Sequence, residues 1–88
     1  MLRLILKDKF CRDVKKLEKK HFDMAKLWKC VDYLLNRQLL LNSYKPHPLK
    51  GKWDGFMECH IEENILLVYY TDDGKLHLVR LGSHDDLF

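Results

Sequence analysis

The sequence predicts an α+β domain in which two N-terminal helices pack on an antiparallel β-sheet, in the order β-α-α-β-β-β. Apolar residues recur at helical spacing between residues 8 and 35. In the second half they alternate with polar residues or form short continuous runs bounded by turn residues, as strands do. The length of 88 residues predicts one domain, 1–88, with a small core and no internal repeat or linker.

The first half is expected to form a short strand and two helices. Leucine occupies every second position from residue 2 to residue 6, which predicts the strand. Asp8 is expected to cap the first helix, which ends near His21. Its apolar side chains are spaced by three or four residues: Phe10, Val14 and Leu17. The second helix follows a cap at Asp23 and continues through an apolar stripe to Leu35.

The second half predicts three strands after a loop over residues 39–52. The strands are expected at 53–61, 65–70 and 76–81. The middle one is nearly all apolar, which predicts a central position in the sheet. Residues 71–74 predict a hairpin turn in which Gly74 takes a positive φ.

Charge is divided unevenly along the chain. Residues 1–52 contain 14 Lys/Arg and 5 Asp/Glu, whereas residues 53–88 contain 2 and 8, and the net charge is +3. A basic first half suits a polyanion or an acidic partner peptide. A solvated helix face explains the same pattern without a partner.

Composition also excludes several classes of protein. The 3 cysteines are odd in number and have no C-x-x-C spacing, so we expect neither a disulfide framework nor a zinc site. No apolar run approaches the roughly 18–20 residues of a membrane span, and no signal-peptide pattern is visible. We therefore expect a cytoplasmic protein with no membrane partner.

Titratable residues gather in the second half. Period-two geometry places Glu58 and His60 on one face of their strand and Cys59 on the other, which argues against a metal cluster of the three. His47 lies between two prolines, which restrict the backbone around it and pre-position its side chain.

The end of the chain places a histidine and an aromatic ring directly after the last strand. Arg80 shares a strand face with Leu76 and Leu78, so it lies at the exposed strand end or its charge meets an anion. His84 and Phe88 follow within a few residues. Chain ends usually fray, so we expect this apolar end to be held against the core or a ligand.

These residue types fit RNA cleavage through the 2′-hydroxyl of the RNA itself. That reaction needs a base, positive charge at the phosphate and an acid for the leaving 5′-oxygen, but no metal. Histidine and glutamate transfer protons, Arg80 matches phosphate oxygens, and Phe88 is able to stack on a base. Taken singly, each of these residues is more often a surface histidine, an ion-pair partner or a hydrophobic plug.

The order of short motifs resembles the YafQ branch of the RelE/ParE toxin superfamily over nearly the whole chain. The motifs are HPLKGKW at 47–53, ECHI at 58–61, LLVY at 66–69, RLGSH at 80–84 and LF at 87–88. The resemblance implies a RelE-like fold and a ribosome-dependent mRNA interferase, that is, an endoribonuclease toxin of a type II toxin–antitoxin pair. It implies no cofactor, and as partners a cognate antitoxin, mRNA and ribosomal RNA.

The resemblance also implies which residues form the site. The catalytic positions correspond to His47, Glu58, His60, Arg80, His84 and Phe88. His84 is the expected general acid, and the general base stays open among His47, Glu58 and His60. Asn64, with its neighbours Glu62 and Glu63, occupies a region where relatives commonly have an aspartate. Asn cannot take up a proton, so either this position only orients a partner or a neighbouring glutamate substitutes. The lysines expected to contact RNA are Lys15, Lys16, Lys19, Lys45, Lys50 and Lys52.

Two other functions fit parts of the sequence. A non-enzymatic, ParE-like toxin that inhibits a topoisomerase by binding explains the basic helices but has no need for several histidines near an arginine. A degenerate toxin kept as a regulatory partner explains Asn64.

Overall fold

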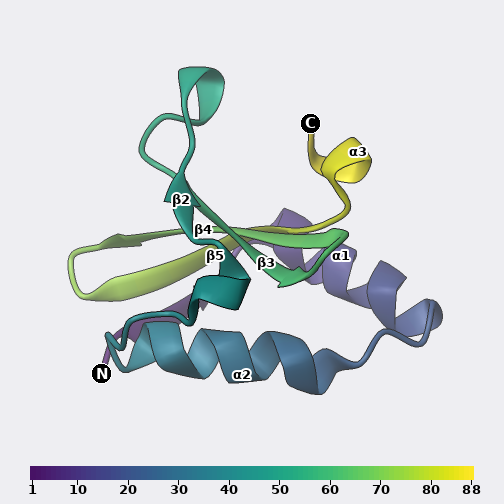
Figure 1. Cartoon of the computed structure of the whole chain (residues 1–88), viewed down its shortest axis with the longest axis horizontal. Helices are drawn as coiled ribbons and strands as arrows, with labels where there is room; N and C mark the ends of the chain where they lie inside the picture. Colours follow the sequence, from purple (N-terminus) through teal and green to yellow (C-terminus); the bar gives the residue numbers. More distant parts are fainter.

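The computed structural model describes all of residues 1–88, which form a five-stranded sheet with helices on both sides (Figure 1). This confirms the predicted α+β class. None of the helices combines the length and the apolar character that a membrane span requires. The elements are β1 (Arg3–Leu6), α1 (Asp8–Lys19), α2 (Met24–Leu35), β2 (His47–Pro48), β3 (Met57–Glu62), β4 (Ile65–Asp72), β5 (Lys75–Gly82) and α3 (His84–Leu87), with 3₁₀ turns at Asn42–Tyr44 and Gly51–Trp53.

The strand order is β1-β5-β4-β3-β2, so β4 is central, as its apolar sequence predicts. The pairs among β2, β3, β4 and β5 are antiparallel. β1 adds one parallel pair at the β5 edge, which the sequence did not predict. A four-residue strand has no residue pattern that distinguishes parallel from antiparallel pairing.

Three local predictions can be compared with the structure. Asp23 does cap α2, because its Oδ1 accepts a hydrogen bond from Ala25 N at 3.1 Å. Asp8 is instead the first residue of α1, and the cap position is Lys7, whose side chain makes no capping bond. The strand predicted over 53–61 begins only at Met57, because Trp53 closes a 3₁₀ turn.

The β4–β5 hairpin turns where the sequence predicts. Asp73 and Gly74 have φ values of 49° and 71°, respectively. Two consecutive residues in the left-handed region give the turn a twist that matches antiparallel strands. Glycine is favoured at such a position because it lacks a Cβ atom.

The pleat of the sheet separates two apolar clusters. The larger one lies between the sheet and helices α1 and α2, and it contains Phe10, Leu27, Cys30, Cys59, Leu67, Leu76, Leu78 and Leu81. A smaller cluster on the opposite face contains Leu66, Val68 and Leu87, with Leu49, Trp53 and Phe56 packed against it. The second cluster holds α3 and the arm over residues 49–56 above the sheet face that α1 and α2 leave uncovered (Figure 1).

A bulge in β5 changes the expected position of Arg80. Val68 pairs with Arg80, but the next residue of β4, Tyr69, pairs with Leu78. Strict alternation is thereby interrupted, and Leu81 rather than Arg80 joins Leu78 in the larger core cluster.

Asp13 of α1 occupies the free edge of β5. β1 ends at Leu6, which pairs with Leu78, so the edge of β5 beyond that point has no neighbouring strand. Asp13 Oδ2 accepts hydrogen bonds from Leu81 N at 2.9 Å and Arg80 Nε at 2.8 Å, and its Oδ1 accepts one from Arg80 Nη2 at 3.2 Å. The Arg80 guanidinium therefore pairs with an anion, as one of the two expectations had it, and this anion is the Asp13 carboxylate of the same chain.

We predict that Asp13→Ala lowers the free energy of unfolding by roughly 2–4 kcal/mol, because it leaves the Arg80 guanidinium and the Leu81 N–H without their partner. Asp23→Ala is the matched control, since it removes an exposed helix cap and should cost only about 1 kcal/mol. Urea unfolding of both variants measures the difference. Equal, small losses would show that the Asp13 contacts contribute little.

Candidate active site

The pairing of β2 with β3 brings the first two site residues together. His47 lies directly opposite Glu58 in the strand register. His47 Nε2 is 3.2 Å from Glu58 Oε1, and the Glu58 side chain is only 8% exposed. A carboxylate this buried needs a partner, and His47 supplies it.

The contacts of His47 indicate how its protons are arranged. Nδ1 lies 2.9 Å from the carbonyl oxygen of Lys45, which only accepts hydrogen bonds, so Nδ1 carries a hydrogen. Nε2 faces the Glu58 carboxylate, so His47 and Glu58 lie within hydrogen-bond distance of each other at the surface of the sheet.

His60 lies on the same face of β3 as Glu58, whereas Cys59 is buried in the core on the other face, as predicted. The His60 ring centroid is 6.4 Å from that of His47. His60 Nδ1 is 3.4 Å from the carbonyl oxygen of Glu63, at the long end of hydrogen-bond distances. Nε2 has no protein partner.

Helix α3 positions the end of the chain. Ser83 caps the helix: its hydroxyl accepts from Asp86 N, and the Asp86 carboxylate accepts from Ser83 N. These bonds, with smaller effects of Lys20 and Lys16, lower the pKa of Asp86. Leu87 is buried beneath the helix, and a side chain on Gly82 would come within 3.3 Å of Asp86. The expectation that the apolar chain end is held down is confirmed.

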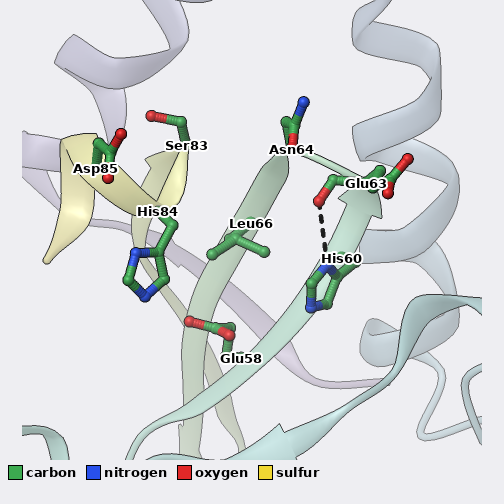
Figure 2. Close-up of a pocket in the computed structure, with 8 residues that line it drawn as sticks. All are labelled: Glu58, His60, Glu63, Asn64, Leu66, Ser83, His84 and Asp85. Carbon is green, nitrogen blue, oxygen red and sulfur yellow. Dashed lines mark hydrogen bonds between the residues drawn. The ribbon is translucent and has the colours of Figure 1, made fainter.

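Side chains from β3, the β3–β4 turn, β4 and α3 line an open cavity of about 600 Å³ (Figure 2). In Figure 2 the Glu58 carboxylate lies between the rings of His60 and His84. An adjoining cavity of about 380 Å³ is lined by His47, Leu49, Lys50, Trp53, Glu58, His84 and Phe88. Because Glu58 and His84 line both cavities, the two cavities form one continuous surface.

Phe88 lines one side of this surface, and the residue is 46% exposed. Its ring centroid is 5.5 Å from that of Trp53 and 5.2 Å from that of His84. A ring that is supported on one side and open on the other provides a stacking surface beside the candidate acid.

The remaining predicted residues lie at the margins or elsewhere. Lys50 lines the second cavity and Lys45 borders His60 from the other side, whereas Lys52 is exposed on the arm. Lys15, Lys16 and Lys19 are exposed on α1. Arg80 does not line the histidine cavities; its guanidinium faces a separate one with Asp13, Lys16 and Lys20. The sequence reasoning missed Asp13, since a lone aspartate in an amphipathic helix has no distinguishing pattern.

Two further features concern ligands. Asn64 lines the larger cavity, from the turn after β3, so this departure from the expected aspartate lies within the site (Figure 2). No group of three or more His, Cys, Asp or Glu side chains is arranged to hold a metal ion.

The family model described as bacterial toxin of type II toxin–antitoxin system, YafQ, matches residues 2–88. This chain belongs to the YafQ toxin family. The mRNA interferase toxin YafQ of Escherichia coli K12 is 40% identical over 80 residues, which cover 90% of this chain and 87% of the relative. The alternative of a ParE-like topoisomerase inhibitor is not favoured by this membership.

Solved structures of relatives agree in fold. A metal-bound toxin from Helicobacter pylori is 46% identical, with a TM-score of 0.95 and full coverage of both chains. YafQ in the E. coli DinJ–YafQ complex is 35% identical, with a TM-score of 0.92 over 100% of this chain and 99% of that one. This YafQ-family chain is therefore a type II toxin with the RelE-like fold.

We predict that the neutral imidazole of His47 is the tautomer with a hydrogen on Nδ1, because that nitrogen faces the Lys45 carbonyl oxygen. Long-range ¹H–¹⁵N NMR correlations of the imidazoles measure the tautomer. The exposed His21, on the α1–α2 turn, is the control. Finding neutral His47 with an unprotonated Nδ1 would contradict the geometry.

Proposed function

We propose that this toxin is a ribosome-dependent endoribonuclease that cleaves mRNA by metal-independent general acid–base catalysis. The observation that supports it best is the arrangement of His47, Glu58, His60 and His84 around one continuous surface on the uncovered sheet face. The E. coli K12 relative is an mRNA interferase by name, which supports the same activity.

In the proposed reaction the 2′-hydroxyl of the RNA attacks the adjacent phosphorus, and the 5′-oxygen of the next nucleotide leaves. His60 is assigned as general base, because its Nε2 has no protein partner while Nδ1 faces a carbonyl oxygen. His84 is assigned as general acid for the leaving oxygen. It lies across the cavity from His60, with Glu58 between the two rings (Figure 2).

His47 fixes the Glu58 carboxylate beside the cavity, where it lies between the rings of His60 and His84. Asn64 has no proton to exchange, so it contributes a hydrogen bond to the substrate rather than an acid–base function. Phe88 stacks on a base next to the scissile bond. The resemblance implies that Arg80 stabilises the scissile phosphate, but its guanidinium faces a neighbouring cavity, so no step of this reaction is assigned to it.

The partners follow the charge of the surface. The exposed lysines on α1 and the arm contact RNA phosphates, which position the toxin without reading sequence. A cognate antitoxin binds the free toxin, as the DinJ–YafQ complex indicates for the E. coli relative. An acidic or amphipathic antitoxin segment would compete with RNA for the same charges.

We predict that His84→Ala loses about 10²–10⁴-fold in cleavage of ribosome-bound mRNA, the usual contribution of a general acid. Folding should be preserved, because the His84 side chain is exposed and makes no hydrogen bond. His21→Asn is the control, because asparagine tolerates the positive φ of 61° at that position. Near-wild-type cleavage by folded His84→Ala protein would remove the assignment.

The products and cofactor requirement form a second prediction. The toxin is first treated with excess EDTA, and magnesium is then restored for the ribosome. Cleavage should persist under these conditions. The upstream fragment should end in a 2′,3′-cyclic phosphate. Mass spectrometry of the fragments identifies the ends. Because an H. pylori relative is metal-bound, a metal-repleted sample is run in parallel. A 3′-hydroxyl product formed only with metal would contradict the proposal.

Phe88 provides a third prediction. Base–aromatic stacking is worth roughly 1–3 kcal/mol, so Phe88→Ala should slow cleavage about 5- to 150-fold with little change in melting temperature. Phe88→Tyr should retain activity and Phe88→Leu should not. If the ring is only a plug over Trp53, leucine will substitute well and alanine will lower the melting temperature.

A further inference from the structure

A third cavity, separate from the two that the histidines line, contains a cluster of basic side chains. It has a volume of about 230 Å³ and is formed by α1, β5 and α3. Its basic residues are Lys16 of α1, Lys20 directly after α1, and Arg80 of β5. Neither lysine belongs to an ion pair; the three ion pairs of the chain involve Lys26, His47 and Arg80.

Asp13 fixes Arg80 in this cavity and leaves part of its guanidinium free. The Asp13 side chain is buried, and it accepts one hydrogen bond from Arg80 Nε and one from Nη2. These bonds raise the pKa of the Arg80 guanidinium. A guanidinium has five N–H donors, so both hydrogens on Nη1 and one on Nη2 have no protein acceptor. Arg80 is therefore held rigidly with donors available for a ligand.

The two carboxylates in the cavity are already engaged. Asp13 is shared between Arg80 and the Leu81 N–H. Asp86 accepts a hydrogen bond from Ser83 N, within the α3 cap, and its charge acts on Arg80, Lys20 and Lys16. The three basic side chains outnumber the two carboxylates, so the cavity keeps a net positive charge, which favours an anion.

We propose that this cavity binds the RNA backbone phosphate next to the scissile one, through Lys16, Lys20 and Arg80, and that Asp13 is a positioning residue for Arg80. The inference rests on the proposed function and adds a substrate subsite to it. Ser83 and Asp85 line the histidine cavity, whereas Gly82 and Asp86 line this one, so a strand that crosses the start of α3 contacts both. The planar fork of arginine matches phosphate oxygens, and the lysines add point charges.

A flanking phosphate is bound equally in the ground state and the transition state, so its loss raises KM and leaves kcat nearly unchanged. Arg80→Ala should raise KM for ribosome-bound mRNA about 10- to 100-fold, in line with hydrogen bonds to charged groups. The double variant Lys16→Ala/Lys20→Ala should also raise KM. Lys75→Ala, on the β4–β5 hairpin, is the control and should not. A fall in kcat at constant KM would assign Arg80 to the scissile phosphate instead and overturn the subsite.

The role of Asp13 is tested with a double-mutant cycle. Asp13→Asn should raise KM in the wild-type background and have no further effect in the Arg80→Ala background, because it acts through Arg80. If the KM increases of Asp13→Asn and Arg80→Ala multiply in the double variant, the positioning role of Asp13 is overturned. Urea unfolding accompanies each variant, and the exposed lysine pair keeps the subsite testable even if Asp13→Asn folds poorly.

A titration without catalysis separates this inference from the proposed function. Inorganic phosphate should shift the ¹⁵N–¹H signal of Arg80 Nε saturably in the wild type, and sodium chloride of equal ionic strength should not. The shift should be lost in Lys16→Ala/Lys20→Ala. If the wild type fails to cleave mRNA, the proposed function is wrong, and this titration alone then tests the phosphate subsite. The absence of a shift with phosphate would overturn the subsite.

Discussion

The pleat of β3 and β4 is the constraint on which the candidate site depends. Helices α1 and α2 cover only one face of the sheet, so each strand residue points either into the main core or toward the uncovered face (Figure 1). Cys59 is fully buried in the core, and its neighbours Glu58 and His60 therefore point outward. A shift of the β3 register by one residue would turn Glu58 and His60 into the core and expose Cys59. The same register thus decides core packing and chemistry.

Two buried carboxylates link this register to the rest of the molecule. Asp13 and Glu58 are the buried charged residues of the chain, and each is paired with a basic side chain. His47, Glu58, Val68 and Arg80 follow one another in the strand register across β2, β3, β4 and β5. The His47–Glu58 pair connects β2 to β3 at one end of this row, and the Asp13–Arg80 pair connects α1 to β5 at the other. Burial makes each pair expensive to break, so the positions of the charges are well defined.

The sequence predicted those parts of the structure that depend on local periodicity. Alternation along β3 placed Glu58 and His60 together, and the turn residues Asp73 and Gly74 located the hairpin. The Asp13–Arg80 contact joins residues 67 positions apart, and no local pattern encodes it. The bulge before Arg80 was also missed, because strand periodicity carries no signal for a single extra residue. Helix α3 is too short for a helical repeat, although Ser83 and Asp86 have the spacing of a capping box.

The central claim is that His84 gives a proton to the leaving 5′-oxygen. A substrate in which that bridging oxygen is replaced by sulfur tests it most directly, because a thiolate leaves without protonation. The measurement is single-turnover cleavage of ribosome-bound mRNA with the oxygen or the sulfur substrate, by wild type and His84→Ala. The account predicts that His84→Ala is slow on the oxygen substrate and close to wild type on the sulfur substrate. Equal impairment of His84→Ala on both substrates would contradict it.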